Sequence, residues 1–594
     1  VKLADGQADN VKLAKPVFVI EPSGSYRATA DLSIGGGMLG QMSLGQARAS
    51  VVATSREIQL NNFAADLFNG RAAGNARIAL VKGGTSQVVA DFNNVDVAGP
   101  LAATAGSAVP LTGRATGRVD LTFPGTEFKL ASGTLTTRLS AEAGQTSGDR
   151  IPITGEISVR ADRGLFDIQT VNLQTPATRL NATGRFSFED DSNLTVDLAS
   201  SDAEELQTVL ISSGLLSSVE EEMRVWKIGL AGQLAFNGNI RGRLKSPDVT
   251  GRFSLGSLMV KGIELGSLAA SIDMNSREIR IPDGRLTEPD GGGMQFSLTA
   301  SRTEENKTSV DATLDRMNAR ALLALSPDTF PGAGGEQLAS QTEGDLSGRI
   351  KVDGIPDAMT GSADIRLGSG KLAGEPLQGM TARATFTGPN VIVESVDIRL
   401  ASGRIAGKGN VNTKTRDFEF QGNAENVQLA RLALLASRPG MPAITGVANA
   451  TTEIKGNLTK GFSAYQIAVD GKASDVTING RPAGDVVLKG TTQDQRLSVT
   501  LTSTILGSPQ VIAAEVNLAD ELLATKIDTT FTNADLTNLF RLLVPGAGVR
   551  VSGRVNGTVS LSGNLVDDDN LHREQANTGQ TGLGRDAAEA VRAA

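Results

Sequence analysis

The chain has 594 residues and a net charge of −8 from 57 basic and 65 acidic residues; 40% of its residues are hydrophobic, but only 4% are aromatic. It has no cysteine and one histidine, His572, which excludes disulfides, thiolate metal sites, cysteine nucleophiles, histidine-based triads and multi-histidine metal sites. Basic and acidic residues are interspersed, and no basic stripe is available to neutralise phosphates, which argues against a nucleic-acid partner. We therefore expect a protein that is not an enzyme and uses no cofactor or metal.

Apolar and polar residues alternate along most of the chain, as they do in strands with one apolar and one wet face. The alternation recurs in residues 364–367, 391–400, 418–422, 526–531 and 551–561. In the last of these segments the odd-numbered residues are apolar or glycine and the even-numbered residues are polar. Short breaks such as Asp290-Gly291, Pro389-Asn390 and Asn479-Gly480 separate the strands, which favours antiparallel hairpins.

A glycine-bounded strand recurs and divides the chain into repeats. Each copy reads glycine, nine residues, glycine, with alternating apolar positions between the two glycines. The copies are Gly232–Gly242, Gly344–Gly354, Gly446–Gly456 and Gly553–Gly563, preceded by a looser copy that runs from Gly113 to Phe123. From 113 to 553 the starting glycines are 119, 112, 102 and 107 residues apart, so a module of about 110 residues is repeated.

A brief helical pattern precedes each of the four clear copies. Each pattern begins at Asn or Asp, which are favoured helix N-caps, and Pro327, Pro439 and Pro545 close three of them. The predicted helices are Asp202–Leu216, Asn318–Leu325, Asn426–Ala436 and Asn533–Val544, with a weaker first copy near Val97–Ala105. Because Leu536, Leu539, Phe540 and Leu543 share one face of the last helix, we expect it to plug or edge the sheet.

Each module has room for roughly seven or eight strands beside its helix, too many in total for one flat sheet. We expect a mainly β fold, an elongated, curled antiparallel sheet that forms a groove (a β-taco), with short helices about every 110 residues. The predicted parts are a β-rich N-terminal segment (1–94), modules 1 to 4 (95–202, 203–318, 319–425 and 426–532), the start of module 5 (533–565) and a polar, disordered tail (566–594).

The apolar face of these strands is the predicted functional surface. The helices are too few to cover it, so it either forms the core of a closed sandwich or barrel, or lines a groove that another molecule fills. Its side chains are mostly small and aliphatic with scattered phenylalanines, which makes a smooth wall suited to acyl chains. The predicted groove-lining residues are Val119, Leu121, Leu234, Phe236, Ile240, Phe253, Leu255, Leu346, Ile350, Val352, Phe418, Phe420, Ile454, Val555, Val559 and Leu561.

Motifs of enzymes are weak in this chain. Gly35, Gly37 and Gly40 have the spacing of a dinucleotide-binding loop, but strand-like alternation follows them where a helix is required. Gly368, Gly370 and Lys371 lack the rest of a phosphate loop, which favours a hairpin turn. The acidic clusters at 189–191 and 220–222 stand beside polar residues, so they favour solvated turns over a shielded catalytic pair.

Two further motifs accompany the repeated strand. The segment ADLTNL at 534–539 precedes the strand GRVNGTVSLSG at 553–563, and the segment LKSPDVTGRF at 244–253 places a leucine and a proline before the glycine that opens the next strand. With these motifs the chain resembles, over roughly residues 95–565, the TamB and AsmA-like superfamily of bacterial envelope proteins. These proteins in turn resemble the bridge-like lipid transfer proteins.

The resemblance implies a periplasmic lipid-transfer bridge that conducts phospholipid acyl chains between the inner and outer membranes of a diderm bacterium and supports outer-membrane biogenesis. The implied partners are phospholipids and both membranes, reached through terminal regions outside this sequence. We expect the sequence to be a fragment of a protein anchored to the inner membrane.

Two alternatives stay open. One is a translocation and assembly module subunit that acts with an Omp85-type barrel in outer-membrane protein assembly. The other is a β-solenoid passenger of an autotransporter or adhesin, although solenoid rungs repeat at about 20 to 30 residues, and regular helices every 110 residues are unexpected in them.

Overall fold

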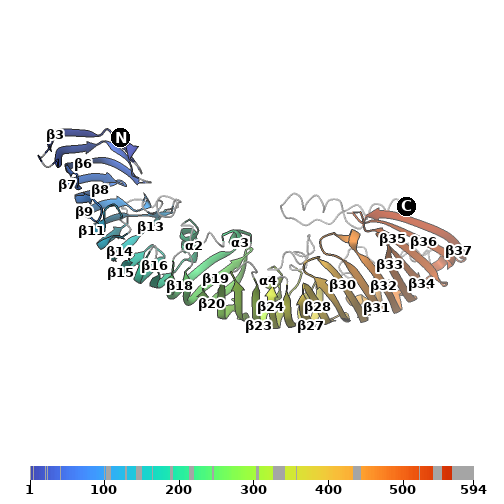
Figure 1. Ribbon diagram of the computed structural model, residues 1–594. Helices are drawn as coiled ribbons and strands as arrows, with labels where there is room; N and C mark the ends of the chain where they lie inside the picture. The colour runs from blue at the N-terminus through green and yellow to red at the C-terminus, as the bar shows by residue number, and fades with distance from the viewer. Residues whose placement is uncertain are drawn as a thin grey trace. The chain divides into compact units, whose positions relative to one another are not determined.

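Antiparallel strands make up most of the molecule. The computed structural model describes residues 2–3, 6–20, 22, 24–39, 42–99, 101, 109–127, 130–141, 150–163, 165–187, 191–212, 220–225, 227–243, 247–302, 307–324, 341–355, 358–432, 443–520, 522–538 and 551–564. The chain divides into two units: unit 1 is Val1–Pro289 with Ser297–Asn306, and unit 2 is Asp290–Phe296 with Lys307–Ala594. Figure 1 labels strands and helices of both units. Within each unit the strands form an open, curled antiparallel sheet with few and short helices, so the predicted fold class is confirmed.

In unit 1, long strands pair with their neighbours in chain order. From β6 to β21 each long strand pairs antiparallel with the next, while the short β10 and β13 pair with each other in parallel. The strands are β1 (Lys2–Leu3), β2 (Gly6–Asp9), β3 (Lys12–Ile20), β4 (Tyr26–Ile34), β5 (Gly36–Leu39), β6 (Met42–Thr54), β7 (Glu57–Leu67), β8 (Gly70–Ala79), β9 (Thr85–Asp96), β10 (Leu111–Thr112), β11 (Arg114–Pro124), β12 (Ser132–Ser140), β13 (Ile151–Pro152), β14 (Thr154–Asp162), β15 (Leu165–Gln174), β16 (Thr178–Ser187), β17 (Ser192–Ser200), β18 (Gly229–Gly242), β19 (Asp248–Val260), β20 (Ile263–Met274) and β21 (Glu278–Thr287). Its helices include α2 (Ala203–Ser212) and α3 (Glu220–Val225), and β22 (Gly293–Ser301) contains residues of both units.

Unit 2 follows the same plan. From β23 to β37 each long strand pairs antiparallel with the next, and the short β26 pairs with β27. The strands are β23 (Thr308–Asn318), β24 (Asp345–Ile355), β25 (Met359–Leu367), β26 (Gly370–Leu372), β27 (Glu375–Gly388), β28 (Asn390–Leu400), β29 (Arg404–Asn412), β30 (Asp417–Gln428), β31 (Ile444–Asn457), β32 (Gln466–Ile478), β33 (Arg481–Gln493), β34 (Arg496–Ser503), β35 (Gln510–Asn517), β36 (Ala524–Asp535) and β37 (Arg554–Asn564). Its helical segments include α4 (Ala319–Ala324), η2 (Leu429–Arg431) and η3 (Phe462–Ala464).

The repeat seen in the sequence corresponds to a group of six long strands. The glycine-bounded segments form β11, β18, β24, β31 and β37, and each of the first four opens such a group in the described chain. The expected seven or eight strands per module is therefore too many, because strands of 9 to 14 residues consume more of the chain than assumed. Six is an even number, so within each unit the chain returns to the same edge of the sheet, and the helical segments that separate the groups lie along that edge.

The boundaries of the predicted modules do not coincide with the boundary between the two units. The division between the units falls near residue 290, inside predicted module 2, and the proposed module boundaries stay a prediction. The predicted β-rich segment 1–94 contains β1 to β8 and most of β9. The predicted tail at 566–594 lies outside the described residues.

Two of the predicted helix N-caps are present. The Asp202 Oδ1 accepts the backbone N–H of Glu204 at 3.0 Å, ahead of α2, and the Asn318 Oδ1 accepts that of Arg320 at 3.0 Å, ahead of α4. Such caps satisfy one of the free N–H groups in a first helical turn. The described parts of these helices end at Ser212 and Ala324, and the remaining predicted residues, 213–216 and 325, lie outside the described residues.

The other two predicted caps are wrong. Asn426 and Asn533 lie inside β30 and β36 at φ values of 51° and 53°, at β-bulges where the register shifts. The Asn426 N–H donates to Asn449 Oδ1 at 2.9 Å, and the Asn533 N–H donates to Asn556 Oδ1 at 2.7 Å. Asparagine is a favoured cap and also tolerates the left-handed conformation that a bulge requires, so its presence alone does not distinguish the two uses.

The chain after each of these bulges also differs from the prediction. β30 ends at Gln428 and continues only as the 3-10 turn η2, with the remaining predicted helical residues 433–436 outside the described ones. After β36 the Asp535 Oδ1 accepts the Asn538 N–H at 3.0 Å, so Asp535 takes the role predicted for Asn533. Residues 539–544 lie outside the described chain.

Glycines inside the strands let neighbouring backbones approach closely. Gly133 in β12 has φ 141°, and a Cβ there would lie 1.9 Å from the carbonyl oxygen of Asp120. Gly348 in β24 has φ 150°, and its Cβ would lie 2.1 Å from the carbonyl oxygen of Asp364. Only glycine accepts this backbone conformation and this contact, and such positions are where sheets bend. We infer that the curl of each sheet depends on them.

Replacing Gly348 by alanine should therefore destabilise unit 2. We expect Gly348→Ala to lower the free energy of unfolding by roughly 1–3 kcal/mol, because the new Cβ forces both backbone strain and a shift of β25. Thermal or urea unfolding followed by far-ultraviolet circular dichroism measures the change. Gly557→Ala in β37 is the matched control, since a Cβ at Gly557 meets nothing within 4 Å. Equal losses in the two variants would contradict a special role for Gly348.

Candidate functional site

Cross-strand rows of apolar residues define one face of the sheet in unit 2. Residues directly opposite each other on successive strands share a face, so the register alone identifies each row. Row A crosses from β23 to β37 through Leu314, Gly348, Ile365, Ala382, Val396, Gly407, Gly422, Thr452, Val469, Gly490, Val499, Ala514, Ile527 and Leu561. Row B crosses the same strands through Met317, Leu346, Leu367, Met380, Ile398, Ile405, Ala424, Ala450, Gly471, Leu488, Leu501, Ile512, Thr529 and Val559.

The sheet of unit 1 has equivalent rows. Row C crosses from β7 to β21 through Phe63, Gly74, Ala90, Val119, Leu135, Val159, Ile168, Gly184, Leu194, Ile240, Val249, Met274 and Ile279. Row D crosses from β9 to β20 through Val95, Ala115, Leu139, Gly155, Leu173, Leu180, Leu198, Phe236, Phe253 and Ala270. The four rows contain no charged residue, and their only polar members are Thr452 and Thr529. Each unit therefore presents one continuous apolar face.

All of the predicted groove-lining residues lie on these apolar faces. In unit 1, the register places Val119, Leu121, Leu234, Phe236, Ile240, Phe253 and Leu255 on one face. In unit 2, it places Leu346, Ile350, Val352, Phe418, Phe420, Ile454, Val555, Val559 and Leu561 on one face. The structure thus brings together the predicted residues within each unit, while lipid contact at these positions stays a prediction.

Most side chains of the apolar face are only half-buried. In row A, for example, Ile365, Val396 and Val499 are neither fully buried nor fully exposed. On the last strand the exposure rises, to 46% for Val559 and 61% for Leu561. The described residues provide no second sheet layer over the middle of the rows, so burial there comes from neighbours on the same curled face.

Full burial is concentrated where helical segments pack on one edge of the face. In unit 1, Ala203 and Leu206 of α2 pack against Leu234 and Leu255. A second cluster in that unit surrounds Val97, at the start of the helical turn closed by the Leu101 N–H. In unit 2, Ala319 of α4 joins Leu367, Leu377 and Leu400. Among the residues that the structure describes, these helical segments close one edge of the apolar face and none lies over its middle.

Phenylalanine rings lie close to glycines of the apolar face. A Cβ on Gly251 would lie 2.8 Å from the Phe236 ring, and one on Gly409 would lie 2.2 Å from the Phe420 ring. Glycine in these positions therefore gives the ring a place to lie against the backbone of the next strand, which resembles aromatic rescue of glycine. The sequence contains no local signal for this pairing because the two residues come from different strands.

The opposite face of each sheet is polar and carries ion pairs between neighbouring strands. In unit 2, Arg349 pairs with Asp311 at 2.8 Å, and Lys472 pairs with Asp485 at 2.8 Å. In unit 1, Arg138 pairs with Glu156 at 2.7 Å. Exposed ion pairs of this kind add little stability individually, but they show that this face is exposed to solvent.

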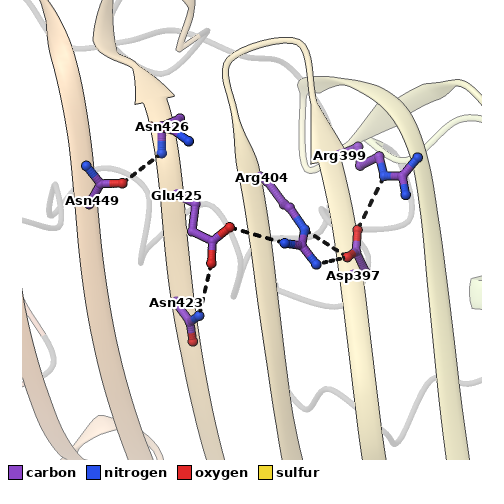
Figure 2. Close-up of polar contacts among 7 residues, drawn as sticks. All are labelled: Asp397, Arg399, Arg404, Asn423, Glu425, Asn426 and Asn449. Carbon is purple, nitrogen blue, oxygen red and sulfur yellow. Dashed lines mark hydrogen bonds and ion pairs between the residues drawn. The ribbon is translucent and has the colours of Figure 1, made fainter.

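One cluster on the polar face links three strands (Figure 2). Arg404 of β29 lies between Asp397 of β28 and Glu425 of β30; its Nη1 donates to Glu425 at 3.1 Å and its Nε donates to Asp397 at 2.8 Å. Arg399 lies 3.6 Å from the same Asp397 carboxylate. The hydrogen bonds from Arg404, followed by its charge, hold the pKa of Asp397 below the usual aspartate value. The cluster therefore links β28, β29 and β30 through ion pairs.

Other classes of site find little support among the described residues. A hollow of about 980 Å³ opens on the polar face of unit 2, but Lys489 and Asp470 in its lining lie 3.7 Å apart and neutralise each other. No group of three His, Asp or Glu side chains in the described ranges is arranged to hold a metal ion. Gly35 lies between β4 and β5, without the helix that a dinucleotide-binding loop requires. None of the described helices is long and apolar enough to cross a bilayer.

The Asp397 cluster predicts an acid-dependent loss of stability. A carboxyl group whose pKa is lowered by folding contributes stability above its unfolded pKa of about 3.9. That contribution disappears as the pH falls through the lower, folded value. Asp397→Asn should therefore be slightly less stable than the unsubstituted chain at pH 7, and the difference should begin to shrink as the pH falls below about 4 and vanish only below the folded pKa of Asp397. Urea midpoints across this pH range measure it, and a difference that is independent of pH would contradict the assignment.

Comparisons of the chain with protein-family models, with curated proteins and with solved structures gave no significant match. The case for a function therefore rests on the two faces of the sheet, on their burial and charge, and on the motifs quoted from the sequence.

Proposed function

We propose that this protein binds phospholipids and conducts their acyl chains along the apolar face of its curled sheets. The acyl chains lie against the apolar rows, and the head groups stay in water along the open edge of the face. The process requires no bond-breaking chemistry from the chain. Movement along the face is passive, because one part of a row is chemically much like the next.

The uncharged rows of unit 2 are the observation that carries this proposal. Rows A and B each cross 14 strands, which at about 4.8 Å per strand is roughly 60 Å of sheet. Monomeric soluble proteins rarely expose a continuous apolar patch larger than a few hundred Å². A face of this extent that remains half-exposed therefore favours a bound apolar partner.

The width of the face suits one acyl chain. On β24 four alternate residues share the apolar face, namely Leu346, Gly348, Ile350 and Val352. Alternate residues of a strand are about 6.8 Å apart, so these four positions span roughly 20 Å. A bilayer core is about 30 Å thick, so the acyl chains of one leaflet extend for about 15 Å. An acyl chain lying parallel to the strands therefore fits between the helix-lined edge and the open edge.

The place of this activity in the cell is part of the proposal. The resemblance to the TamB and AsmA-like superfamily supports a location in the periplasm of a diderm bacterium, anchored to the inner membrane, with lipid passing between the inner and outer membranes. Assembly of outer-membrane proteins with an Omp85-type barrel remains the alternative role within that resemblance. Antiparallel pairing between successive long strands does not favour the β-solenoid passenger, whose rungs stack in parallel.

Neighbouring residues of β34 offer a direct test. Val499 belongs to row A and is half-buried, whereas Thr500 lies on the polar face and is exposed. A photoreactive amino acid at position 499 should form adducts with phospholipid when the protein is illuminated in cells or with vesicles. The same amino acid at position 500 should not. Adducts at neither position, or equally at both, would contradict lipid binding on the apolar face.

A charge introduced at the same two positions tests phospholipid binding to the apolar face. Val499→Asp should reduce the phospholipid that co-purifies with the chain by about tenfold or more, because an unpaired carboxylate is costly to bury under an acyl chain. Thr500→Asp should leave it unchanged. Mass spectrometry of extracted lipid gives the amounts, and circular dichroism checks that both variants fold.

A further inference from the structure

Four aromatic rings gather at one edge of the apolar face in unit 2. The Phe418 ring centroid lies 5.9 Å from that of Phe420 and 5.2 Å from that of Tyr465, which in turn lies 5.4 Å from Phe462. Phe462 is 54% exposed and Phe420 is 37% exposed, so the cluster is partly exposed to solvent. In a chain with only 4% aromatic residues this concentration is unusual. We call these four residues the aromatic rim.

The aromatic rim includes Phe462 of η3 and lies on the edge opposite η2. β30 begins beside it at Asp417 and ends at Gln428, where η2 follows. Gly456 makes room for the rim, because a Cβ there would lie 2.7 Å from the Tyr465 ring and 3.1 Å from the Phe418 ring. The rim therefore belongs to the open edge of the apolar face, where the proposed function places lipid head groups.

Two turns at the rim are bonded into one unit. The Asn457 Nδ2 donates to the Thr415 carbonyl at 2.8 Å and to Asp417 Oδ1 at 2.7 Å. The Leu458 N–H donates to the Arg416 carbonyl at 2.9 Å. Asn457 is only 6% exposed, and both hydrogen bonds that its Nδ2 donates link the two turns. The turn after β29 and the turn before β32 therefore hold a fixed position relative to each other.

Positive charge is concentrated in the same two turns. Lys414 and Lys460 are exposed and Arg416 is half-buried, while Asp417 supplies the one carboxylate within the turns, which Asn457 already engages. Three cations and one carboxylate leave a net charge of +2 beside the partly wet rings. Aromatic rings together with Lys and Arg are the combination that proteins place at the boundary between acyl chains and head groups.

We propose that the aromatic rim and its two basic turns bind the phosphate head group of a phospholipid whose acyl chain lies on the neighbouring apolar rows, with a preference for head groups of net negative charge. This inference rests on the proposed lipid-binding function and adds a head-group selectivity to it. The rings contact the glycerol and upper acyl region, and the cations face the phosphate. The occupant is a membrane phospholipid, because the rings and the rows behind them contribute nothing to binding free phosphate.

The test is capture of lipid from vesicles that contain equal amounts of phosphatidylcholine and phosphatidylglycerol. The full chain is incubated with the vesicles, repurified, and its lipid quantified by mass spectrometry. We expect phosphatidylglycerol to be enriched about threefold to tenfold over phosphatidylcholine. The Lys414→Glu/Lys460→Glu variant should lose the enrichment while its total captured lipid stays near that of the unsubstituted chain. As a control, Lys472→Glu/Lys489→Glu makes the same two charge reversals on the polar face, so it has the same net charge as the first variant, and it should keep the enrichment.

The outcomes separate the two proposals. Capture without enrichment in the unsubstituted chain, or enrichment that survives in the double variant, overturns the head-group inference and leaves lipid binding standing. Capture of no phospholipid by any of the proteins overturns both. A loss of enrichment in Lys472→Glu/Lys489→Glu as large as in Lys414→Glu/Lys460→Glu would show an effect of net charge alone and would also overturn the role of the rim.

Discussion

An antiparallel sheet with one apolar face must have that face covered, and the described residues supply helical cover along only one edge of it. In unit 1, α2 seals the end of the face at Leu234 and Leu255; in unit 2, α4 seals it at Leu367 and Leu400. Within the described ranges, the side chains in the middle of the rows contact neighbours on their own face. The apolar area of the sheet is therefore larger than the area that these helices cover, and the rest of the structure depends on this constraint.

The high glycine content fits a sheet whose apolar face has to curl. Glycines such as Gly133 and Gly348 permit close backbone contacts and positive φ values, and Gly251 and Gly409 leave space for phenylalanine rings of the neighbouring strand. Both roles of glycine keep the apolar face free of protruding side chains, and the first also allows the sheet to curl. The resulting surface is smooth rather than interlocking, which suits a partner that slides more than one that docks rigidly.

Much of the architecture is predictable from the sequence, since period-two alternation alone places Phe236, Val559 and Leu561 on the apolar face. The helix positions are predictable where Asp202 and Asn318 act as caps. The same reasoning fails at Asn426 and Asn533, because one residue type serves both caps and bulges and the deciding partner is an asparagine on the next strand. The aromatic rim is unpredictable for the same reason, since Tyr465 and Phe418 meet only through the register of β30, β31 and β32.

The absence of cysteine from the sequence allows the central claim to be measured cleanly. Single cysteines placed in turn at positions 497 to 502 of β34 can be reacted with a water-soluble maleimide, with and without phospholipid. The account predicts protection of positions 497, 499 and 501 that appears only with phospholipid, and unchanged reactivity at 498, 500 and 502. Protection that is absent, or equal on both faces of the strand, would contradict it.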